Sequence, residues 1–250
     1  MIPAGTYQMG SDGGNADEKP PHQVTVDMFC IDRTEVTVAA YAACVREGSC
    51  SPAPTTADWP GIGEDEKALD SQFCNGMRED RQQHPINCVD WNLANAYCRA
   101  VGKRLPLEEE WEYAARGQDG RKYPWGNAAP NPELLNTCDA ECVAMGERLG
   151  HSGWPSMFSG SDGWESTSPV GSYPKGASPF GLLDMAGNVW EMTSSGYSMD
   201  YGSQRNGEKH VYRGGGWGYH DPFLIRTTYR GKSVPTYRGA DLGFRCAQTP

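Results

Sequence analysis

Residues 181–191 read GLLDMAGNVWE, and the architecture can be inferred outward from this stretch. Its carboxylates, Asp184 and Glu191, stand seven positions apart, and between them lie Gly187 and Asn188, which tolerate left-handed or tight backbone. Such a loop can aim two side chains and several carbonyl groups at one point, and calcium requires a shell of hard oxygens of this kind. Spacing alone favours a simpler interpretation, a turn between two strands with Trp190 in the core.

The stretch is similar to the GLYDMxGNVWEW motif of the formylglycine-generating enzyme family, also called sulfatase-modifying factors. Further family motifs follow in the family's order: IPAGTYQMG at 2–10, RTEVTVAAY at 33–41, HPINCVDW at 84–91, AYCRAVGKRLP at 96–106, EEEWEYAARG at 108–117, YPWGN at 123–127, VYRGGGW at 211–217 and LGFRCA at 242–247. The resemblance covers nearly the whole chain and implies a C-type-lectin-like α+β fold with few short helices and strands and long loops. It does not fix the reaction, because one fold serves many functions.

Composition narrows the classes of protein. No composition break marks a boundary, so one domain over residues 1–250 is expected. With 31 Gly and 18 Pro, the chain should be rich in turns and irregular loops. The net charge of -10 argues against nucleic acid and anionic membranes as partners. No apolar run approaches the roughly 20 residues of a membrane helix, so no membrane insertion is expected. No leader segment is recognisable, since the first family motif begins at Ile2.

Nine cysteines indicate disulfides and an oxidising compartment, and hence a secreted, periplasmic or cell-surface protein. No CxxC pair is present, so zinc-ribbon spacing is absent. Local spacing brings together Cys44 with Cys50, Cys74 with Cys88, and Cys138 with Cys142, although nine cysteines allow many pairings. The resemblance adds Cys98 with Cys246, which leaves Cys30 as a buried small apolar residue.

Alternation predicts strands over 5–9, 22–29, 211–217 and 241–247, and caps and stop signals predict helices over 38–47, 91–101 and 107–116. Thr37 and Asp90 should cap the first two helices, and Gly48, Gly102 and Gly117 should end the three. One face of the second helix should be buried: Leu93, Ala94, Tyr97, Cys98 and Val101. Residues 51–72 are interpreted as a surface excursion.

Two features of the middle of the chain call for a stabilising partner. Family members usually have Thr where Leu107 stands, and loss of such a cap typically costs about 1 kcal/mol. We therefore expect that helix to begin more loosely or with another cap. Residues 117–180 are predicted to be loop, and so long a structureless segment usually needs a ligand or a staple.

The resemblance supplies that ligand as calcium at two sites. The first falls on Asn136, the Thr137 carbonyl, Asp162 and the Trp164 carbonyl, and the second on Asp184, the carbonyls of Gly187 and Val189, and Glu191. The side-chain oxygens that each site requires are present. In the alternative interpretation, Asp162 merely begins an Asp-Gly turn.

No catalytic residue is assigned. Formylglycine-generating enzymes bind copper(I) with two cysteines that follow the glycine-rich motif, and thiolates suit that ion. Here no cysteine lies between Cys142 and Cys246, and the position of the family's active-site Ser is Gly216. Other family members hold iron with histidines, but none of the five histidines here is spaced as HxxxH or HxE. The copper-thiolate oxidation is therefore expected to be absent.

The same C-terminal segment predicts a ligand surface instead. The resemblance places on it Trp190, Trp217, Tyr219, His220, Asp221, Phe223, Leu224 and Tyr229. Aromatic side chains give large, rigid contact area, which suits binding. In the alternative interpretation, half of them point inward and only close the core. Four arginines that recur in the family are interpreted as scaffold ion pairs: Arg213, Arg226, Arg230 and Arg245.

The favoured hypothesis is a calcium-stabilised binding domain whose C-terminal surface meets a protein or glycan ligand. Variable proteins of diversity-generating retroelements use this segment of the fold as a diversified ligand surface, and the resemblance extends to that use. The alternative is a divergent metal-dependent oxidoreductase that modifies a peptide or a small thiol. The oligomeric state stays open.

Overall fold

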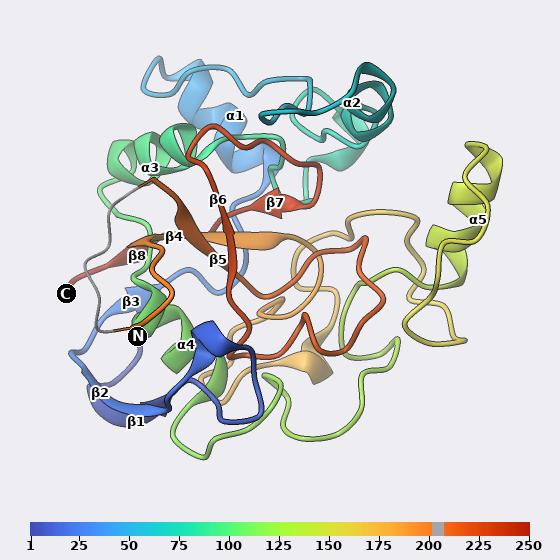
Figure 1. Ribbon diagram of the computed structural model, residues 1–250. Helices are drawn as coiled ribbons and strands as arrows, with labels where there is room; N and C mark the ends of the chain where they lie inside the picture. Colours follow the sequence, from blue (N-terminus) through green and yellow to red (C-terminus); the bar gives the residue numbers. More distant parts are fainter. Residues whose placement is uncertain (202–207) are drawn as a thin grey trace.

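A computed structural model describes residues 1–201 and 208–250 (Figure 1). Its strands are β1 Gly5–Met9, β2 His22–Val26, β3 Cys30–Ile31, β4 Trp190–Gly196, β5 His210–Arg213, β6 Gly231–Ser233, β7 Leu242–Gly243 and β8 Ala247–Gln248. Its α-helices are α1 Val38–Arg46, α2 Glu64–Ser71, α3 Trp91–Ala100, α4 Glu108–Arg116 and α5 Ala140–Arg148, with short 3-10 turns at Ala16–Glu18, Glu79–Arg81 and Pro174–Gly176. Short elements joined by long loops are the α+β architecture that the resemblance implies.

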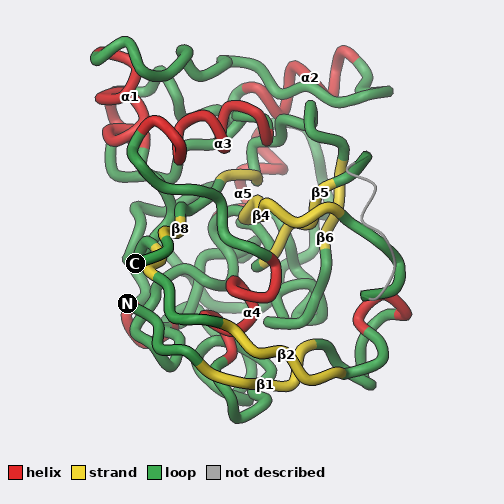
Figure 2. The backbone as a smooth tube through the Cα atoms, turned by 90° about the vertical axis from the view of Figure 1, so that its left-hand side faces the viewer, coloured by secondary structure: helices red, strands yellow, loops and turns green. Residues whose placement is uncertain are grey.

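A four-stranded sheet lies at the centre, in the order β6-β5-β4-β7. Strands β4 and β5 are antiparallel, with Glu191 opposite Arg213, whereas β4 and β7 are parallel, with Trp190 opposite Leu242. Two small antiparallel ribbons, β1-β2 and β3-β8, complete the strand pairing. Figures 1 and 2 show α1, α2 and α3 at one end of the molecule and the β1-β2 ribbon at the other, with the sheet between them.

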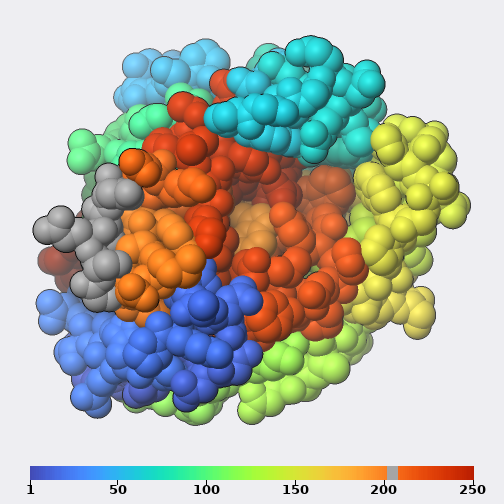
Figure 3. All heavy atoms as spheres, viewed as in Figure 1, coloured from blue at the N-terminus to red at the C-terminus, as the bar shows by residue number. Residues whose placement is uncertain are grey.

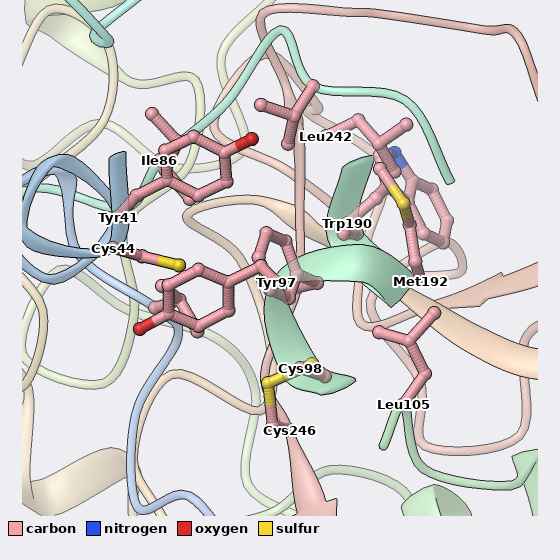
Figure 4. Packing of buried hydrophobic residues seen from close by; sticks show 14 of the residues in the cluster. Tyr41, Cys44, Ile86, Tyr97, Cys98, Leu105, Trp190, Met192, Leu242 and Cys246 are labelled. Carbon is pink, nitrogen blue, oxygen red and sulfur yellow. A yellow bond between two sulfur atoms is a disulfide. The ribbon is translucent and has the colours of Figure 1, made fainter. Parts of the chain in front are cut away.

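The largest core cluster joins α1 and α3 to the sheet (Figure 4). Tyr41 of α1 and Tyr97 of α3 stack with ring centroids 5.4 Å apart, and both pack in the cluster that contains Trp190 and Leu242. The helix caps form as the sequence predicts: Thr37 accepts from Ala40 N at 3.1 Å, and the carboxylate of Asp90 accepts from Leu93 N at 2.9 Å.

Helix α4 carries a buried network of charge. Glu112 pairs with Arg213 and Glu108 with Arg230, and all four side chains are essentially unexposed. Arg226 with Glu18 and Arg245 with Glu191 form two more buried pairs. The prediction that these arginines are scaffold residues is confirmed, since each satisfies a carboxylate that would otherwise be costly to bury.

The helix begins without a Thr cap, and two other groups replace it. The Glu110 carboxylate accepts from Leu107 N at 2.8 Å, and Ser195 Oγ of β4 accepts from Glu108 N at 2.9 Å. Of the two outcomes expected for the helix that follows Leu107, a looser start or another cap, the second is therefore correct.

All four expected disulfides form: Cys44–Cys50, Cys74–Cys88, Cys98–Cys246 and Cys138–Cys142. They are consistent with an extracellular or periplasmic protein. Cys30 is free, but it is half-buried, so the expectation of a buried residue is wrong: it lies in the marginal β3-β8 ribbon rather than in a core cluster. Across residues 1–201 and 208–250, no helix is long and apolar enough to cross a membrane.

Several predicted boundaries need correction. Residues 51–72 contain α2, which buries none of its residues. The loop predicted over 117–180 contains α5, whose cap residue Asp139 accepts from Glu141 N at 3.0 Å. Val101 lies beyond α3 and is 42 % exposed, so it is not part of the buried face. The strand predicted over 22–29 ends at Val26, and the strand predicted over 211–217 is β5. The strand predicted over 241–247 divides into β7 and β8, because residues 244–246 lie in neither strand.

Candidate functional site

The loop that precedes β4 adopts the tight backbone that its residues predict. Asp184, Gly187 and Asn188 all have positive φ, at 57°, 79° and 57°. A Cβ at Gly187 would stand 2.1 Å from the Asn136 carbonyl oxygen, so only glycine fits there. Asn188 then joins the loop to its surroundings, because its side chain accepts from Ser168 N and donates to Glu35 Oε1, both at 3.0 Å.

The second predicted calcium set surrounds this loop. Asp184 accepts from Gly171 N through Oδ2 at 2.6 Å, whereas its Oδ1 is buried without a hydrogen-bond partner, and so is Glu35 Oε2. Burial raises the pKa of both carboxyls, and repulsion from Asp184 adds to the rise for Glu35, as repulsion from Glu191 does for Asp184. Glu191 is different, because Arg245 and Trp111 Nε1 already occupy its oxygens. The orphaned oxygens of Asp184 and Glu35 fit a cation, and Glu191 has only its remaining lone pair to offer.

The first predicted set is brought together by one carboxylate. Asp162 Oδ2 accepts from Thr137 N at 2.9 Å and from Asn136 Nδ2 at 3.3 Å, and its Oδ1 accepts from Trp164 N at 2.9 Å. Asn136 Oδ1 is buried and has no hydrogen-bond partner. Burial raises the pKa of Asp162 to about 7. A bound cation would satisfy the amide oxygen and favour the charged carboxylate, so this set also fits calcium.

The described residues contain no group of three or more His, Cys, Asp and Glu side chains that could hold a metal ion. The calcium sets draw on backbone carbonyls, which such a group does not include. The five histidines are dispersed. His84 is buried, and its Nδ1 lies 3.1 Å from Thr167 Oγ1. His210 stacks on Trp91, His22 packs on Tyr201, and His151 packs on Trp154. His220 is exposed beside Trp217.

The main pocket lies at the C-terminal surface and has a volume of about 400 Å³. Figure 3 shows the hollow among the orange and red atoms of the C-terminal third, with blue N-terminal atoms at its rim. Five aromatic residues line it: Trp190, Tyr212, Tyr219, Tyr229 and Tyr237. Leu224, Asp17, Arg230, Lys232 and Asp241 also contribute. A concave, largely aromatic cavity of this size suits a small ligand or a single inserted side chain.

The predicted ligand residues divide between two places. Trp190, Tyr219, Leu224 and Tyr229 line the main pocket, and Phe223 packs edge-on against Tyr229 with ring centroids 5.8 Å apart. The other three lie elsewhere: Trp217 and His220 line a separate cleft beside Cys138 and Trp154, and Asp221 is exposed and caps the turn to Phe223.

Sequence reasoning missed part of the lining. Tyr212 belongs to the strand motif VYRGGGW, where alternation does not show which side chains reach a cavity. Asp17 enters from the N-terminal loop, about two hundred residues away in sequence from the lining residues of the C-terminal segment. Asp241 directly precedes the LGFRCA motif, and a carboxylate between Ala240 and Leu242 is the signal that could have marked it.

Asp241 contributes a carboxylate to the lining of the pocket. Burial, the nearby Asp70 carboxylate and a counteracting hydrogen bond from Tyr219 together bring the pKa of Asp241 to about 6. A Cβ at Gly239 would stand 2.6 Å from Asp241 Oδ1, so glycine makes room for the carboxylate. The charges at the rim are paired: Lys232 with Asp17 at 3.2 Å, and Arg230 with Glu108 at 2.6 Å.

The profile of the sulfatase-modifying factor enzyme 1-like domain matches residues 1–250. The formylglycine-generating enzyme of Streptomyces coelicolor is 35% identical over 294 residues, which cover 98% of this chain and 87% of that protein. The chain belongs to the formylglycine-generating enzyme family. Another member, the inactive C-alpha-formylglycine-generating enzyme 2 of Bos taurus, is 33% identical over 280 residues, covering 99% of this chain and 86% of that one.

Solved structures share the family fold. PvdO from Pseudomonas aeruginosa has a TM-score of 0.72 at 27% identity and covers 100% of this chain and 93% of that chain. Variable protein 1 of Treponema denticola has a TM-score of 0.69 at 22% identity, covering 100% and 94%. The C-type-lectin-like α+β fold of the formylglycine-generating enzyme type is therefore shown.

Gly216, which the resemblance places where the family's active-site Ser stands, borders the main pocket. A Cβ at Gly216 would stand 3.0 Å from the Asp241 carbonyl oxygen and 3.4 Å from the Trp190 ring. Among the residues that line the described pocket none is a cysteine. Cys246, which lies nearest in sequence, is bonded to Cys98 in the core.

Proposed function

We propose that this member of the family is a ligand-binding domain that does not carry out the copper-thiolate oxidation. The proposal rests on a difference in residue types at one place in the fold. Where the family's catalytic Ser and thiols are expected, this chain has Gly216 and a pocket of aromatic rings around Asp241. Aromatic walls contribute binding area, and rings and a carboxylate do not replace thiolates as ligands for copper(I).

Calcium is proposed as the structural ion of this domain. The buried Asn136 Oδ1 and Asp184 Oδ1, both without a hydrogen-bond partner, support it, because an oxygen buried in this way is costly unless it binds a donor or a cation. Both belong to loops that contribute no strand to the central sheet. Calcium at Asn136 and Asp162, and at Asp184, would neutralise charge that packing alone leaves uncompensated.

The proposed ligand is a protein or a glycan outside the reducing cytosol, which agrees with the four disulfides. The pocket is too small to enclose a whole macromolecule, so a side chain or a sugar ring would enter it while the surrounding surface makes the wider contact. If this is a variable protein of a diversity-generating retroelement, its gene should lie near a reverse transcriptase and a repeat of its own 3′ end.

The test combines metal analysis with an activity assay on the purified full chain. Calcium without stoichiometric copper or iron, together with no aldehyde formed on a cysteine-containing peptide under oxygen and copper(I), is the expected result. Stoichiometric copper or iron, oxygen consumption with a thiol peptide, or formylglycine in the product would overturn the proposal and favour a divergent oxidoreductase.

A further inference from the structure

The main pocket contains an excess of negative charge that no described residue neutralises. Asp241 has no ion-pair partner within residues 1–201 and 208–250, whereas the other charged side chains at the pocket, Asp17, Arg230 and Lys232, are all paired. A further carboxylate, Asp70, lies close enough to repel Asp241. A ligand that enters the cavity therefore meets one uncompensated carboxylate.

Lys232 does not serve as an internal counterion. Its ammonium group donates to Asp17 Oδ2 at 3.2 Å and to the Tyr197 hydroxyl at 2.5 Å, and the same hydroxyl donates to Asp17 at 2.8 Å. Asp17 and Tyr197 therefore hold the ammonium group of Lys232 at the rim of the pocket. Asp241 is thus left to interact with whatever occupies the cavity.

The aromatic rings form walls at different angles. Trp190 and Tyr219 are perpendicular with centroids 5.4 Å apart, and Trp190 and Tyr229 are inclined by 44° at 5.7 Å. Tyr212 and Tyr237 are inclined by 44° at 6.4 Å. Rings that line one pocket and are inclined to one another can present π-faces to its contents, and a π-face attracts a cation, above all one with a weakly hydrated organic shell.

We propose that the pocket recognises an organic ammonium group, with the aromatic rings contacting its alkyl shell and Asp241 supplying the opposite charge. This inference rests on the proposed function and names the ligand chemistry of the same pocket. A neutral sugar or an aliphatic side chain would contact the aromatic rings but would leave the negative charge of Asp241 uncompensated. An anion would be repelled by Asp241 and Asp70. An unpaired carboxylate in an aromatic cavity destabilises the fold, and a cation that enters the cavity stabilises the charged carboxylate.

The test compares choline with 3,3-dimethyl-1-butanol, which has the same shape but no charge, on the disulfide-bonded chain of residues 1–250. Calorimetry measures the affinity, and tryptophan fluorescence reports on the pocket through Trp190. We expect choline to bind about tenfold or more tightly than the alcohol, and Asp241→Asn to remove about tenfold of the choline affinity. The matched control is Asp65→Asn, an exposed carboxylate of α2, which should leave the affinity unchanged.

A second arm identifies the source of the ammonium group. Tighter binding of a trimethyllysine peptide than of choline would support a protein side chain, and the reverse would support a free small ammonium compound; both support the proposal. Thermal melting verifies that Asp241→Asn is folded, and Tyr229→Ala, which keeps the carboxylate, should also weaken choline binding.

Equal affinity for choline and the alcohol, or unchanged affinity in folded Asp241→Asn, would overturn the ammonium proposal. Binding of a saccharide or a protein that Tyr229→Ala abolishes, without any binding of choline, would overturn it as well while leaving the ligand-binding function intact. Absence of binding by every cationic, neutral, saccharide and protein probe would overturn both.

Discussion

The guanidinium of Arg245 donates to both carboxylate oxygens of Glu191, at 2.6 and 2.7 Å, and neither side chain is exposed. Arg245 also donates to the carbonyl oxygens of Asp32, Arg33 and Leu183. One arginine near the end of the chain thus binds the N-terminal third, the loop before β4 and β4 itself. The last residue of the GLLDMAGNVWE stretch is therefore part of the scaffold.

Replacing Arg245 by Met should destabilise the domain by about 3–5 kcal/mol, because Glu191 would remain buried without its counter-charge. Urea unfolding followed by tryptophan fluorescence measures the change. The control is Lys175→Met, which breaks the exposed pair with Glu133 and should leave the unfolding midpoint nearly unchanged. Equal effects of the two substitutions would contradict the scaffold role of Arg245.

Calcium should raise the melting temperature, and EGTA should lower it, because an ion that binds only the folded state stabilises it by mass action. Asp162→Asn should remove a large part of this calcium-dependent increment, since an amide lacks the charge of the carboxylate. Differential scanning fluorimetry with and without calcium measures the increment, which separates lost calcium binding from general destabilisation. A melting temperature that does not respond to millimolar calcium would count against the calcium proposal.

The disulfides should differ in how much they stabilise the protein. Cys98–Cys246 spans 148 residues and Cys44–Cys50 spans six, and loop-closure entropy assigns them about 5 and about 2 kcal/mol. Paired Cys→Ala variants, compared by chemical unfolding, measure both. A larger loss from the short bridge would show that strain or residual unfolded-state structure outweighs loop entropy here.

Ammonium affinity should rise with pH around the pKa of Asp241, about 6, because the carboxyl is neutral below that value and charged above it. Asp70 and Tyr219 face this group and act on it in opposite directions. Since the folded state holds this proton more tightly than the unfolded state, Asp241 should lower stability as pH rises from its ordinary value of 3.8 to about 6. Calorimetric titrations on either side of the transition test the affinity, and Asp241→Asn should flatten both the affinity and the melting profile.

The parts of the fold that sequence could predict have strong local chemistry. Thr37 and Asp90 cap helices because a side-chain oxygen meets an orphan backbone donor, and this can be recognised in sequence. Helix α2 could not be predicted in this way, since it buries no residue and therefore lacks an apolar period. The α5 helix carries its own cap, Asp139, but lies in a segment whose Gly and Pro content suggests loop.

The pocket was predictable only in part, because it is assembled across the fold. Trp190, Tyr219 and Tyr229 could be found through the family resemblance, which points to the C-terminal segment. Asp17 could not, since its pairing with Lys232 depends on the N-terminal loop reaching β6. Trp217 shows the reverse error: its Nε1 donates to the Ala240 carbonyl at 3.1 Å, and the ring packs on Phe73 away from the main pocket.

The most direct measurement is mass spectrometry of a cysteine-containing peptide incubated with the copper(I)-supplied protein and oxygen, with elemental analysis of the purified protein before copper is added. The peptide should keep its thiol, and the protein should hold calcium without stoichiometric copper or iron. An aldehyde in place of the thiol, or a redox metal at one equivalent, would contradict the proposal that the main pocket binds a ligand without oxidising it.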